Sequence, residues 1–564
     1  MLRLMNLNHQ NMESDNVKRA RSSVARNAGI VSLAVMASRV LGLVRDQVFA
    51  IFFGAGLYYD AFLTAFRIPN LLRDLFAEGA LSAAFVTTFT QVLATKGEKE
   101  AIRLSNRVAT LMIVVITAIS LVAWWYAPSI VHILAPGFYD VPGKAELTIT
   151  LTRIMIPFLL LIALAAQAMG ILNARGRFGM PALASAFFNV GSILGGLMLG
   201  FGVGPAIGLS AIEGMAYGTL VGGFLQFAVQ WPSLIRTGFS YRPMISISDP
   251  GVRQIFGLMG PAIIGTAAVQ VNVFVNTNFA SSIIDSATGA VANGPVSWLS
   301  YAFRFMQFPI GVFGVAIATA TLPPLSRSSA QTDYIEFRRT LAHSLALVFL
   351  LCIPSAVGLA VLGRPIVALI FEHGKFTAFD TVQTGDALVA YSIGLAGYAA
   401  VKVLSPAFYA LGDARTPMLI SVGSIVVNYV MNFLLVRPFG HVGLAFSTST
   451  VALVNFILLA IFMRRRIGRL EGSRLGNTLA RICVAAIPMA LVAWLVSELS
   501  GNLPLAGIVL RLVRVSAPIT LAAIVFYVAC RLLRIQELDE AIEAIAGRFL
   551  RGLRKIRGGA GSGR

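Results

Sequence analysis

Arginines and carboxylates inside apolar stretches are the side chains of this sequence that could bind a charged ligand. The richest segment begins at Ser38 and reads SRVLGLVRDQVFAIFFGAGLYYDAFLTAFRIPNLLRDLFAEGA. An arginine at the centre of a membrane-spanning helix costs about 2.5–3.5 kcal/mol on insertion scales. It persists there when it faces water, pairs with a carboxylate or meets an anion. Since a guanidinium group matches phosphate oxygens bidentately, these residues favour a phosphate or pyrophosphate ligand.

Two helices joined by a short Gly-rich turn are expected to position these charges. Residues seven apart lie nearly above one another on a helix, so Arg39 and Asp46 share one stripe, with Arg45 beside it. The second helix has a polar stripe of Arg67, Asn70, Asp74 and Glu78, with Arg73 at its edge. One alternative is that the charges pair with one another and only hold the helices together. The excess of arginines over carboxylates favours an anionic ligand instead.

A further arginine lies in the second half of the chain. Its polar stripe consists of Ser297, Ser300, Tyr301, Arg304 and Gln307. Arg304 has no carboxylate within one turn in the sequence, so it needs water, a partner from another helix or a ligand. The alternative is a helix-end arginine whose side chain reaches the membrane surface. Asn272, Asn276, Asn428 and Asn432 form pairs four residues apart, and these suit interhelical hydrogen bonds or a cation site.

The composition is that of an integral membrane protein. Of 564 residues, 57% are hydrophobic and 12% are charged, whereas soluble domains carry about 25% charged residues. The net charge of +20 lies in short loops between apolar runs, which indicates membrane topology and argues against nucleic-acid binding. The histidines and cysteines are scattered without the spacing of a metal site or a catalytic motif. We therefore expect no enzyme, no metal site and no cofactor.

The apolar runs predict an all-α fold with about fourteen membrane-spanning helices. They lie near 27–53, 60–93, 106–127, 147–172, 181–202, 211–231, 253–281, 296–322, 341–363, 383–411, 416–436, 441–463, 477–499 and 510–533. Alternate loops hold most of the Lys and Arg residues, and the opposite loops hold few, among them Lys144. The positive-inside rule then places both termini in the cytoplasm.

Three pairs of landmarks repeat at one offset. Arg67 in RIPNLL corresponds to Arg304 in RFMQFP, 237 residues later. PSIVHILAPGF from Pro128 corresponds to PIVALIFEHGKF from Pro365, also 237 residues later, and both are expected to form short interfacial or re-entrant turns. The turn that ends at Pro181 corresponds to one 236 residues on. The offset predicts two six-helix halves of the same orientation, an arrangement that in transporters has its binding site between the halves.

This repeat gives the predicted division of the chain. The parts are a cytoplasmic tail (1–25), an N-lobe with helices 1–6 (26–235), a cytoplasmic linker (236–252), a C-lobe with helices 7–12 (253–463), two C-terminal helices (464–534) and a basic cytoplasmic tail (535–564). The polar, basic start has no cleavable apolar core, so no removable signal peptide is expected.

The motifs SRVLGLVRDQVFAIFFGAG, YYDAFLTAFRIPNLLRDLFAEGALSAAFV and FRFMQFPIGVFGVAIATATLPPLS resemble the MviN/MurJ family of lipid II flippases. The likeness runs from about Ala25 to Arg534. It implies a fourteen-helix, two-lobe bundle of the multidrug, oligosaccharidyl-lipid and polysaccharide exporter group. It also implies transport of undecaprenyl-pyrophosphate-linked peptidoglycan precursor from the inner to the outer leaflet by alternating access.

The resemblance implies the site residues as well. Family cavity positions for the substrate fall on Arg39, Arg45, Asp46, Arg73 and Arg304, and Ser38, Asp60, Asn70 and Glu78 match motif positions of less clear role. The chain departs from relatives that have acidic residues beside the second-half arginine, because Phe303 and Gln307 stand there. It also has Asn432 near the position where relatives with a sodium site carry an aspartate.

The predicted function is therefore a lipid II flippase in the bacterial cytoplasmic membrane. Its partners would be lipid II, the membrane and cell-wall synthesis proteins, with no nucleic acid. A flippase for another polyprenyl-pyrophosphate-linked oligosaccharide and a membrane scaffold with structural ion pairs are the alternatives. A cation-coupled drug exporter is disfavoured, because it would carry buried Asp or Glu in excess.

Overall fold

The computed structural model describes residues 31, 33–74, 82–285, 288–468, 472–501, 503–504 and 507–539. The predicted tail 1–25, Glu78 and the predicted tail beyond residue 539 lie outside the described residues. Within them the chain is helical, and its β-structure amounts to one isolated antiparallel bridge between Ile284 and Val291. The predicted all-α class is confirmed.

The described helices fall in two compact units, one made of Met1–Phe49 with Leu57–Gln270 and the other of Ala50–Gly56 with Val271–Arg564. The first unit begins with a helix over 33–53 that ends in the second unit. It continues with α2 (Leu57–Arg73), α3 (Ser82–Trp125), α4 (Ala127–Leu134), η2 (Pro136–Asp140), α5 (Lys144–Met155), α6 (Phe158–Ala174), α7 (Gly179–Leu197), η3 (Met198–Gly202), η4 (Gly204–Ile207), α8 (Ala211–Ala228), α9 (Trp231–Ile235) and α10 (Pro250–Ser281), which also passes into the second unit. The second unit adds α11 (Pro295–Pro309), η5 (Ile310–Gly314), α12 (Val315–Ala330), α13 (Tyr334–Phe371), α14 (Ala378–Ala410), α15 (Arg415–Ile467), α16 (Gly472–Gly501) and α17 (Gly507–Leu532).

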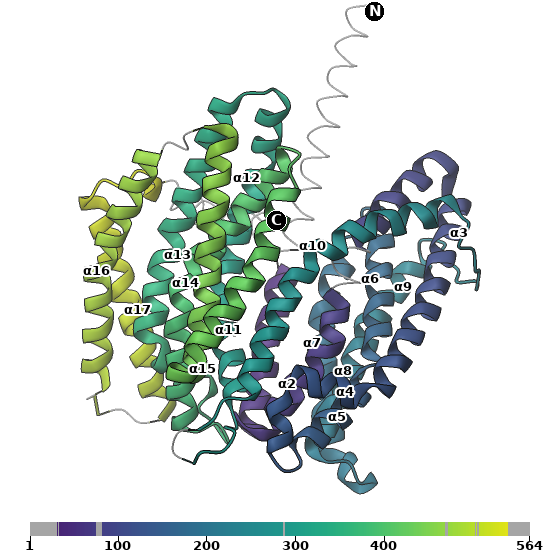
Figure 1. The fold of residues 1–564 in the computed structure, drawn as a ribbon, viewed down its shortest axis with the longest axis horizontal. Coiled ribbons are helices and arrows are strands. Elements are labelled where there is room, and N and C mark those ends of the chain that lie inside the picture. The colour runs from purple at the N-terminus through teal and green to yellow at the C-terminus, as the bar shows by residue number, and fades with distance from the viewer. Residues whose placement is uncertain are drawn as a thin grey trace, which may run out of the picture. The chain divides into compact units, whose positions relative to one another are not determined.

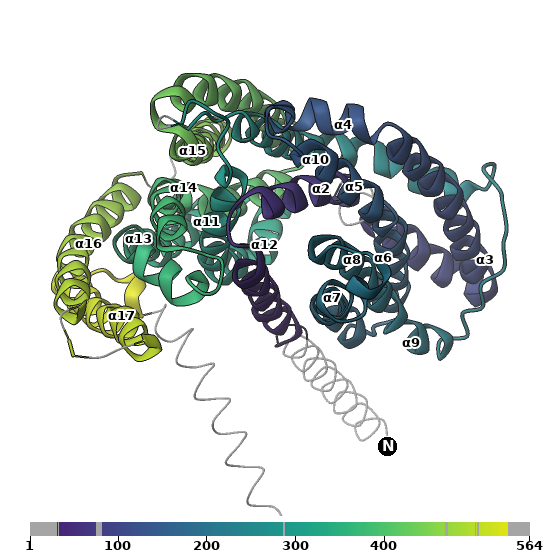
Figure 2. The ribbon, with the colours of Figure 1, turned by 90° about the horizontal axis from the view of Figure 1, so that it is seen from below.

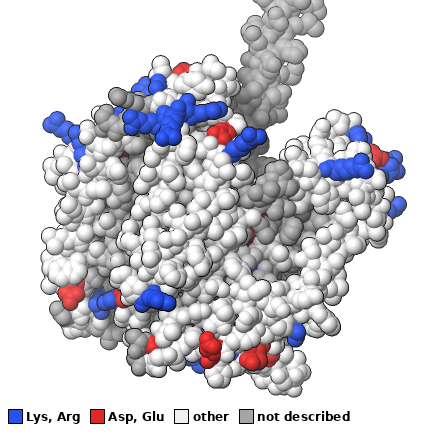
Figure 3. All heavy atoms as spheres, viewed as in Figure 1, with Lys and Arg blue, Asp and Glu red and all other residues white. Residues whose placement is uncertain are grey.

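Helix lengths and composition fit a polytopic membrane protein. Among the described residues, nine helices are long and apolar enough to cross a membrane. Two of these contain a residue with a non-helical backbone that separates two helices, namely Gly97 in α3 and Gly440 in α15, and Gly440 lies between two predicted spans. On the visible face of each unit, Lys, Arg, Asp and Glu side chains lie near the two ends, and the surface between them is almost entirely uncharged (Figure 3). The count is compatible with the predicted polytopic membrane protein.

The sequence repeat is visible in the helix bounds. Adding 237 to the bounds of α2 gives 294–310, and α11 covers Pro295–Pro309. The same shift takes α5 and α6, from 144 to 174, onto 381–411, and α14 covers Ala378–Ala410. The shifted bounds agree with the observed ones to within three residues, which is consistent with the predicted repeat.

The segment from Pro365 is not a separate turn. It forms the last turns of α13, which runs unbroken to Phe371, whereas its counterpart from Pro128 forms the short helix α4. The Phe371 ring lies 4.6 Å from Tyr301 and 5.5 Å from Phe305, measured between centroids. Burial of Phe371 in this aromatic cluster offsets the hydrogen bond that Pro365 cannot donate. The prediction of a separate turn at Pro365 is therefore wrong, while its place at the membrane interface stays a prediction.

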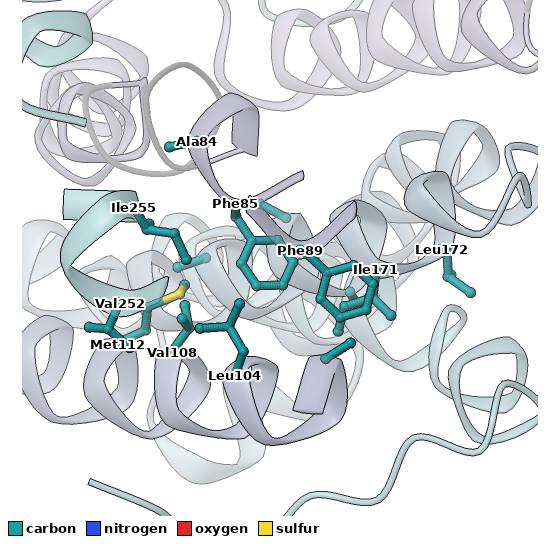
Figure 4. Packing of buried hydrophobic residues seen from close by; sticks show 14 of the residues in the cluster. Ala84, Phe85, Phe89, Leu104, Val108, Met112, Ile171, Leu172, Val252 and Ile255 are labelled. Carbon is teal, nitrogen blue, oxygen red and sulfur yellow. The ribbon is translucent and has the colours of Figure 1, made fainter. Parts of the chain in front are cut away.

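A buried apolar cluster forms the core of the first unit (Figure 4). Phe85 and Phe89 of α3 stack on each other at 5.4 Å between centroids. Leu104 and Val108 contribute from the part of α3 beyond its non-helical break at Gly97, and Ile171 contributes from α6. The shared contacts hold α3, α6 and the start of α10 together.

Helices α7 and α8 pack at unusually close range, with glycine against glycine. A Cβ atom on Gly218 would lie 2.3 Å from the backbone nitrogen of Gly196, and one on Gly214 would lie 2.2 Å from that of Gly200. Small residues let membrane helices approach in this way. Both helices lie in the first unit, where they run side by side (Figures 1 and 2).

In the second unit, α16 and α17 pack on α13 (Figures 1 and 2). Leu362, Met489, Ala493 and Ala522 form their shared buried cluster. Arg511 of α17 donates to the carbonyl of Glu372 at 2.6 Å and to its carboxylate at 3.0 Å, so it caps the end of α13. The two C-terminal helices are thereby anchored to the helices that precede them.

Candidate functional site

Arg45 and Asp46 form an ion pair on the helix over 33–53. Arg45 Nη2 donates to Asp46 Oδ1 at 3.2 Å, and the two side chains are 18% and 5% exposed. The guanidinium carbon of Arg45 also lies 5.7 Å from the centroid of the Phe188 ring on α7. Because the pair is largely removed from water, its charges act at a lower dielectric than surface charges do.

A row of aromatic rings connects Phe188 with α2. Ring centroids are 6.2 Å apart between Phe62 and Phe66, 5.6 Å between Phe66 and Phe158, and 5.5 Å between Phe158 and Phe188. The row runs from α2 through α6 to α7. Packing of large rigid side chains therefore fixes the surface on which Arg45 rests.

Ser38 contributes its backbone to the same region. Asn189 of α7 donates through Nδ2 to the carbonyl oxygens of Ser38, at 3.1 Å, and of Ser185, at 3.2 Å. Arg39 follows with an exposed side chain, and Asn70 is half-buried on α2. These three predicted residues lie in the first unit with Arg45 and Asp46.

Arg73, the last residue of α2, pairs with the next residue. Its Nε and Nη2 atoms donate to Asp74 Oδ1 at 3.1 and 2.9 Å. The second carboxylate oxygen, Oδ2, accepts a hydrogen bond of 3.0 Å from Nε2 of Gln270 on α10. The Arg73 and Asp74 side chains are 23% and 27% exposed, so solvent or a ligand can reach them.

Asp60 has a different environment from the arginine pairs. Its Oδ2 accepts from Lys144 Nζ at 2.9 Å, and both side chains are 0% exposed. Lys144 Nζ also lies 4.1 Å from the centroid of the Phe138 ring. The sequence suggested a loop lysine at this position, but the structure places Lys144 at the start of α5 in the core. In the sequence, the signal for a buried cation near Asp60 was its carboxylate, which stands in an otherwise apolar stretch without a basic residue within one turn.

Arg304 lies on α11 in the second unit and is half-buried. The preceding residue, Phe303, packs edge-on against Tyr391 of α14 at 5.4 Å between centroids. This contact with Tyr391 accounts for the aromatic side chain at position 303.

The four predicted asparagines hydrogen-bond between α10 and α15. Asn432 Nδ2 donates to Asn276 Oδ1 at 2.7 Å and to Asn428 Oδ1 at 2.9 Å. Asn276 donates to Thr448, and Asn272 donates to Ser424. Interhelical hydrogen bonding, one of the two predicted roles, describes these contacts, and the Oδ1 atoms of Asn272 and Asn432 are buried without a hydrogen-bond partner among the described residues. No group of three or more His, Cys, Asp or Glu side chains in the described part of the chain is arranged to hold a metal ion.

The apolar helices and the ion pairs buried among them define a multi-pass helical membrane protein. A family profile described as lipid II flippase MurJ matches residues 49–513. The lipid II flippase MurJ of Burkholderia cenocepacia is 36% identical over 440 residues, which cover 77% of this chain and 83% of the relative. A probable lipid II flippase MurJ of Vibrio cholerae is 37% identical, with 76% and 81% covered. The chain belongs to the lipid II flippase MurJ family.

Solved structures agree with this assignment. The inward closed conformation of a lipid II flippase MurJ matches with a TM-score of 0.71 and 26% identity, over 89% of this chain and 99% of that one. An inward-facing MATE family transporter of the MOP superfamily matches with a TM-score of 0.61 over 78% and 95% of the two chains. At 16% identity, the second likeness concerns the fold alone.

Proposed function

We propose that this chain transports lipid II from the inner to the outer leaflet of the cytoplasmic membrane by alternating access. The family match over residues 49–513 is the observation that carries the proposal. The relatives named above share about four-fifths of their own length with this chain. No covalent step is involved, so the protein needs to bind a charged headgroup and release it on the other side.

The pyrophosphate of the headgroup is the proposed ligand of the arginines. In Arg45 and Arg73 the guanidinium groups already donate to a carboxylate oxygen, and a phosphate oxygen offers the same geometry with more charge. Binding then exchanges Asp46 or Asp74 for the ligand and leaves no arginine donor uncompensated in an apolar region. Arg39 of the first unit and Arg304 of the second unit are each proposed to contact a lipid headgroup during transport, on the basis of their chemistry and motif positions.

Replacement of a host's essential lipid II flippase by this chain tests the function. Growth on depletion of the host protein is expected, together with lipid II exposure on the outer leaflet. In reconstituted vesicles, lipid II and a polyprenyl-pyrophosphate lipid with a different oligosaccharide are compared side by side. Transport of the second lipid without transport of lipid II would favour the alternative substrate, and transport of neither would contradict both.

A further inference from the structure

The carboxylate of Asp74 is shared between two elements of the first unit. One oxygen accepts hydrogen bonds from Nε and Nη2 of Arg73 at the end of α2, and the other accepts a hydrogen bond from Nε2 of Gln270 on α10. Hydrogen bonds with an ionised acceptor are shorter and stronger than neutral ones. A change at one oxygen of a partly buried carboxylate therefore alters the bond at the other oxygen.

Gln270 occupies a particular place on α10. It is the last residue of the first unit, and Val271 is the first residue of α10 in the second unit. Two and six residues farther on, Asn272 and Asn276 donate to Ser424 and Thr448 of α15. Side-chain hydrogen bonds thus connect α10 to Asp74 at the end of α2 through Gln270, and to α15 through Asn272 and Asn276.

We propose that Gln270 is a positioning residue that couples headgroup binding at Arg73 to α10. The inference rests on the proposed function. Without ligand, Gln270 donates to Oδ2 of Asp74 and so orients the carboxylate. Oδ1 of Asp74 then accepts hydrogen bonds from Nε and Nη2 of Arg73. A pyrophosphate oxygen that binds these donors displaces Asp74, and the bond between Asp74 and Gln270 is lost with it. Binding of the headgroup thereby releases α10 from the end of α2.

Loss of the Gln270 donor has opposite effects on affinity and rate. In Gln270→Met, which keeps the side-chain length, the ligand no longer has to break the bond to α10. The lipid II content that gives half-maximal flipping in vesicles is expected to fall roughly tenfold to a hundredfold, the range for one hydrogen bond to a charged group. The maximal rate is expected to fall at least as much, because binding no longer releases α10. Substitution of a residue with only a structural role would not raise the affinity for lipid II while it lowers the maximal rate.

Gln254 offers a matched control on the same helix. Its Nε2 donates to Gln91 Oε1 at 3.1 Å on the exposed surface. Gln254→Met makes the same substitution on α10 and removes a bond to a neutral amide away from Arg73, and both kinetic parameters are expected to stay at the level of the unsubstituted protein. Gln270→Asn keeps an amide but shortens it by one methylene, so the same split with a smaller amplitude is expected even where the methionine variant folds poorly.

A double-substitution cycle tests the route through Asp74. Asp74→Ala alone and Asp74→Ala combined with Gln270→Met should behave alike, since Gln270 acts only through the carboxylate. If Gln270→Met matches Gln254→Met in both kinetic parameters while Arg73→Ala abolishes flipping, the inference is overturned and the proposed function stands. Full flipping by Arg73→Ala would overturn the site and the inference together. Equal losses in rate, affinity and folded protein would assign Gln270 a structural role only.

Discussion

Arg45, Arg73 and Arg304 are the side chains whose loss separates ligand binding from structural pairing. We expect Arg45→Ala, Arg73→Ala and Arg304→Ala each to abolish flipping while the protein reaches the membrane in normal amount. Folding should survive because the remaining carboxylates keep other contacts, as Asp74 does with Gln270. The measurements are outer-leaflet lipid II and membrane abundance.

Arg364 supplies the control for this series. It pairs with Asp386 at 2.7 Å, but the two side chains are 58% and 37% exposed, and such surface pairs contribute about 0–1 kcal/mol. Arg364→Ala should leave flipping and abundance unchanged. If the three candidate variants instead disappear from the membrane, the arginines hold the helices together and the ligand assignment is wrong.

The buried pair of Asp60 and Lys144 is expected to act on stability. Lys144→Met leaves a carboxylate without its cation at a site with no solvent exposure, which typically costs about 3–5 kcal/mol. Thermal unfolding in detergent should show this loss. Asp60→Asn combined with Lys144→Met should recover much of it, and flipping per folded molecule should stay normal. A double variant that is stable but inactive would return Asp60 to the transport site.

Sequence analysis could predict ion pairs between residues adjacent in the chain, but it could not predict contacts between residues far apart in the chain. The Arg45–Asp46 and Arg73–Asp74 pairs join residues adjacent in the chain. Gln270 and Lys144 meet their carboxylates only after α10 and α5 have packed, 196 and 84 residues away in the sequence. A glutamine in an apolar helix carries no mark of its partner, because its hydrogen bond depends on tertiary structure.

The contact between α7 and α8 gives a test on the level of helices. A Cβ on Gly218 would meet the backbone of Gly196, which cannot yield as a flexible side chain would. Gly218→Ala is therefore expected to destabilise the first unit by about 1–3 kcal/mol, the usual cost of overpacking. Thermal unfolding of the purified protein measures it.

Gly257 on α10 is the matched position, since an added Cβ there meets nothing within 4 Å. Gly257→Ala should be neutral or stabilising by up to about 1 kcal/mol, because alanine is the better helix former. Equal stability of the two alanine variants would mean that α7 and α8 pack less closely than described.

Apolar runs predicted where the helices lie, but local signals failed at some of their ends. Arg364 and Pro365 suggested the end of a helix, yet α13 continues because Phe371 is buried among Tyr301, Phe305 and Phe376. Tertiary burial outweighs the local preference of proline there. Gly440, in contrast, does separate two helices within α15, as the spacing of the runs predicted.

The orientation of the whole molecule in the membrane remains a prediction from loop charge. Reporter fusions after Arg327 and Arg466 should report the cytoplasm, and fusions after Gly137 and His373 should report the outside. The reason is the excess of Lys and Arg in one set of loops, which favours retention on the cytoplasmic side. A cytoplasmic signal at Gly137 would contradict the helix count of the first half.

The driving force of transport also belongs to the whole molecule. A pyrophosphate-linked lipid that leaves a negative-inside cell moves negative charge down the electric field. Each elementary charge that crosses 100 mV is worth about 2.3 kcal/mol, so a headgroup with about two negative charges gains roughly 4–5 kcal/mol without a coupled ion. Permanently cationic arginines that return inward are favoured by the same potential.

The asparagine cluster argues against an obligatory sodium ion. Asn432 carries no charge, so it lacks the anionic oxygen that a carboxylate would offer a cation, and its Nδ2 donates to Asn276 and Asn428. We therefore expect collapse of the membrane potential to stop flipping, and removal of sodium at constant potential to leave it unchanged. Lipid II exposure on the outer leaflet of vesicles measures both. Strict sodium dependence would contradict this expectation, and Asn276→Ala and Asn432→Ala would then be the first variants to test for a lost cation site.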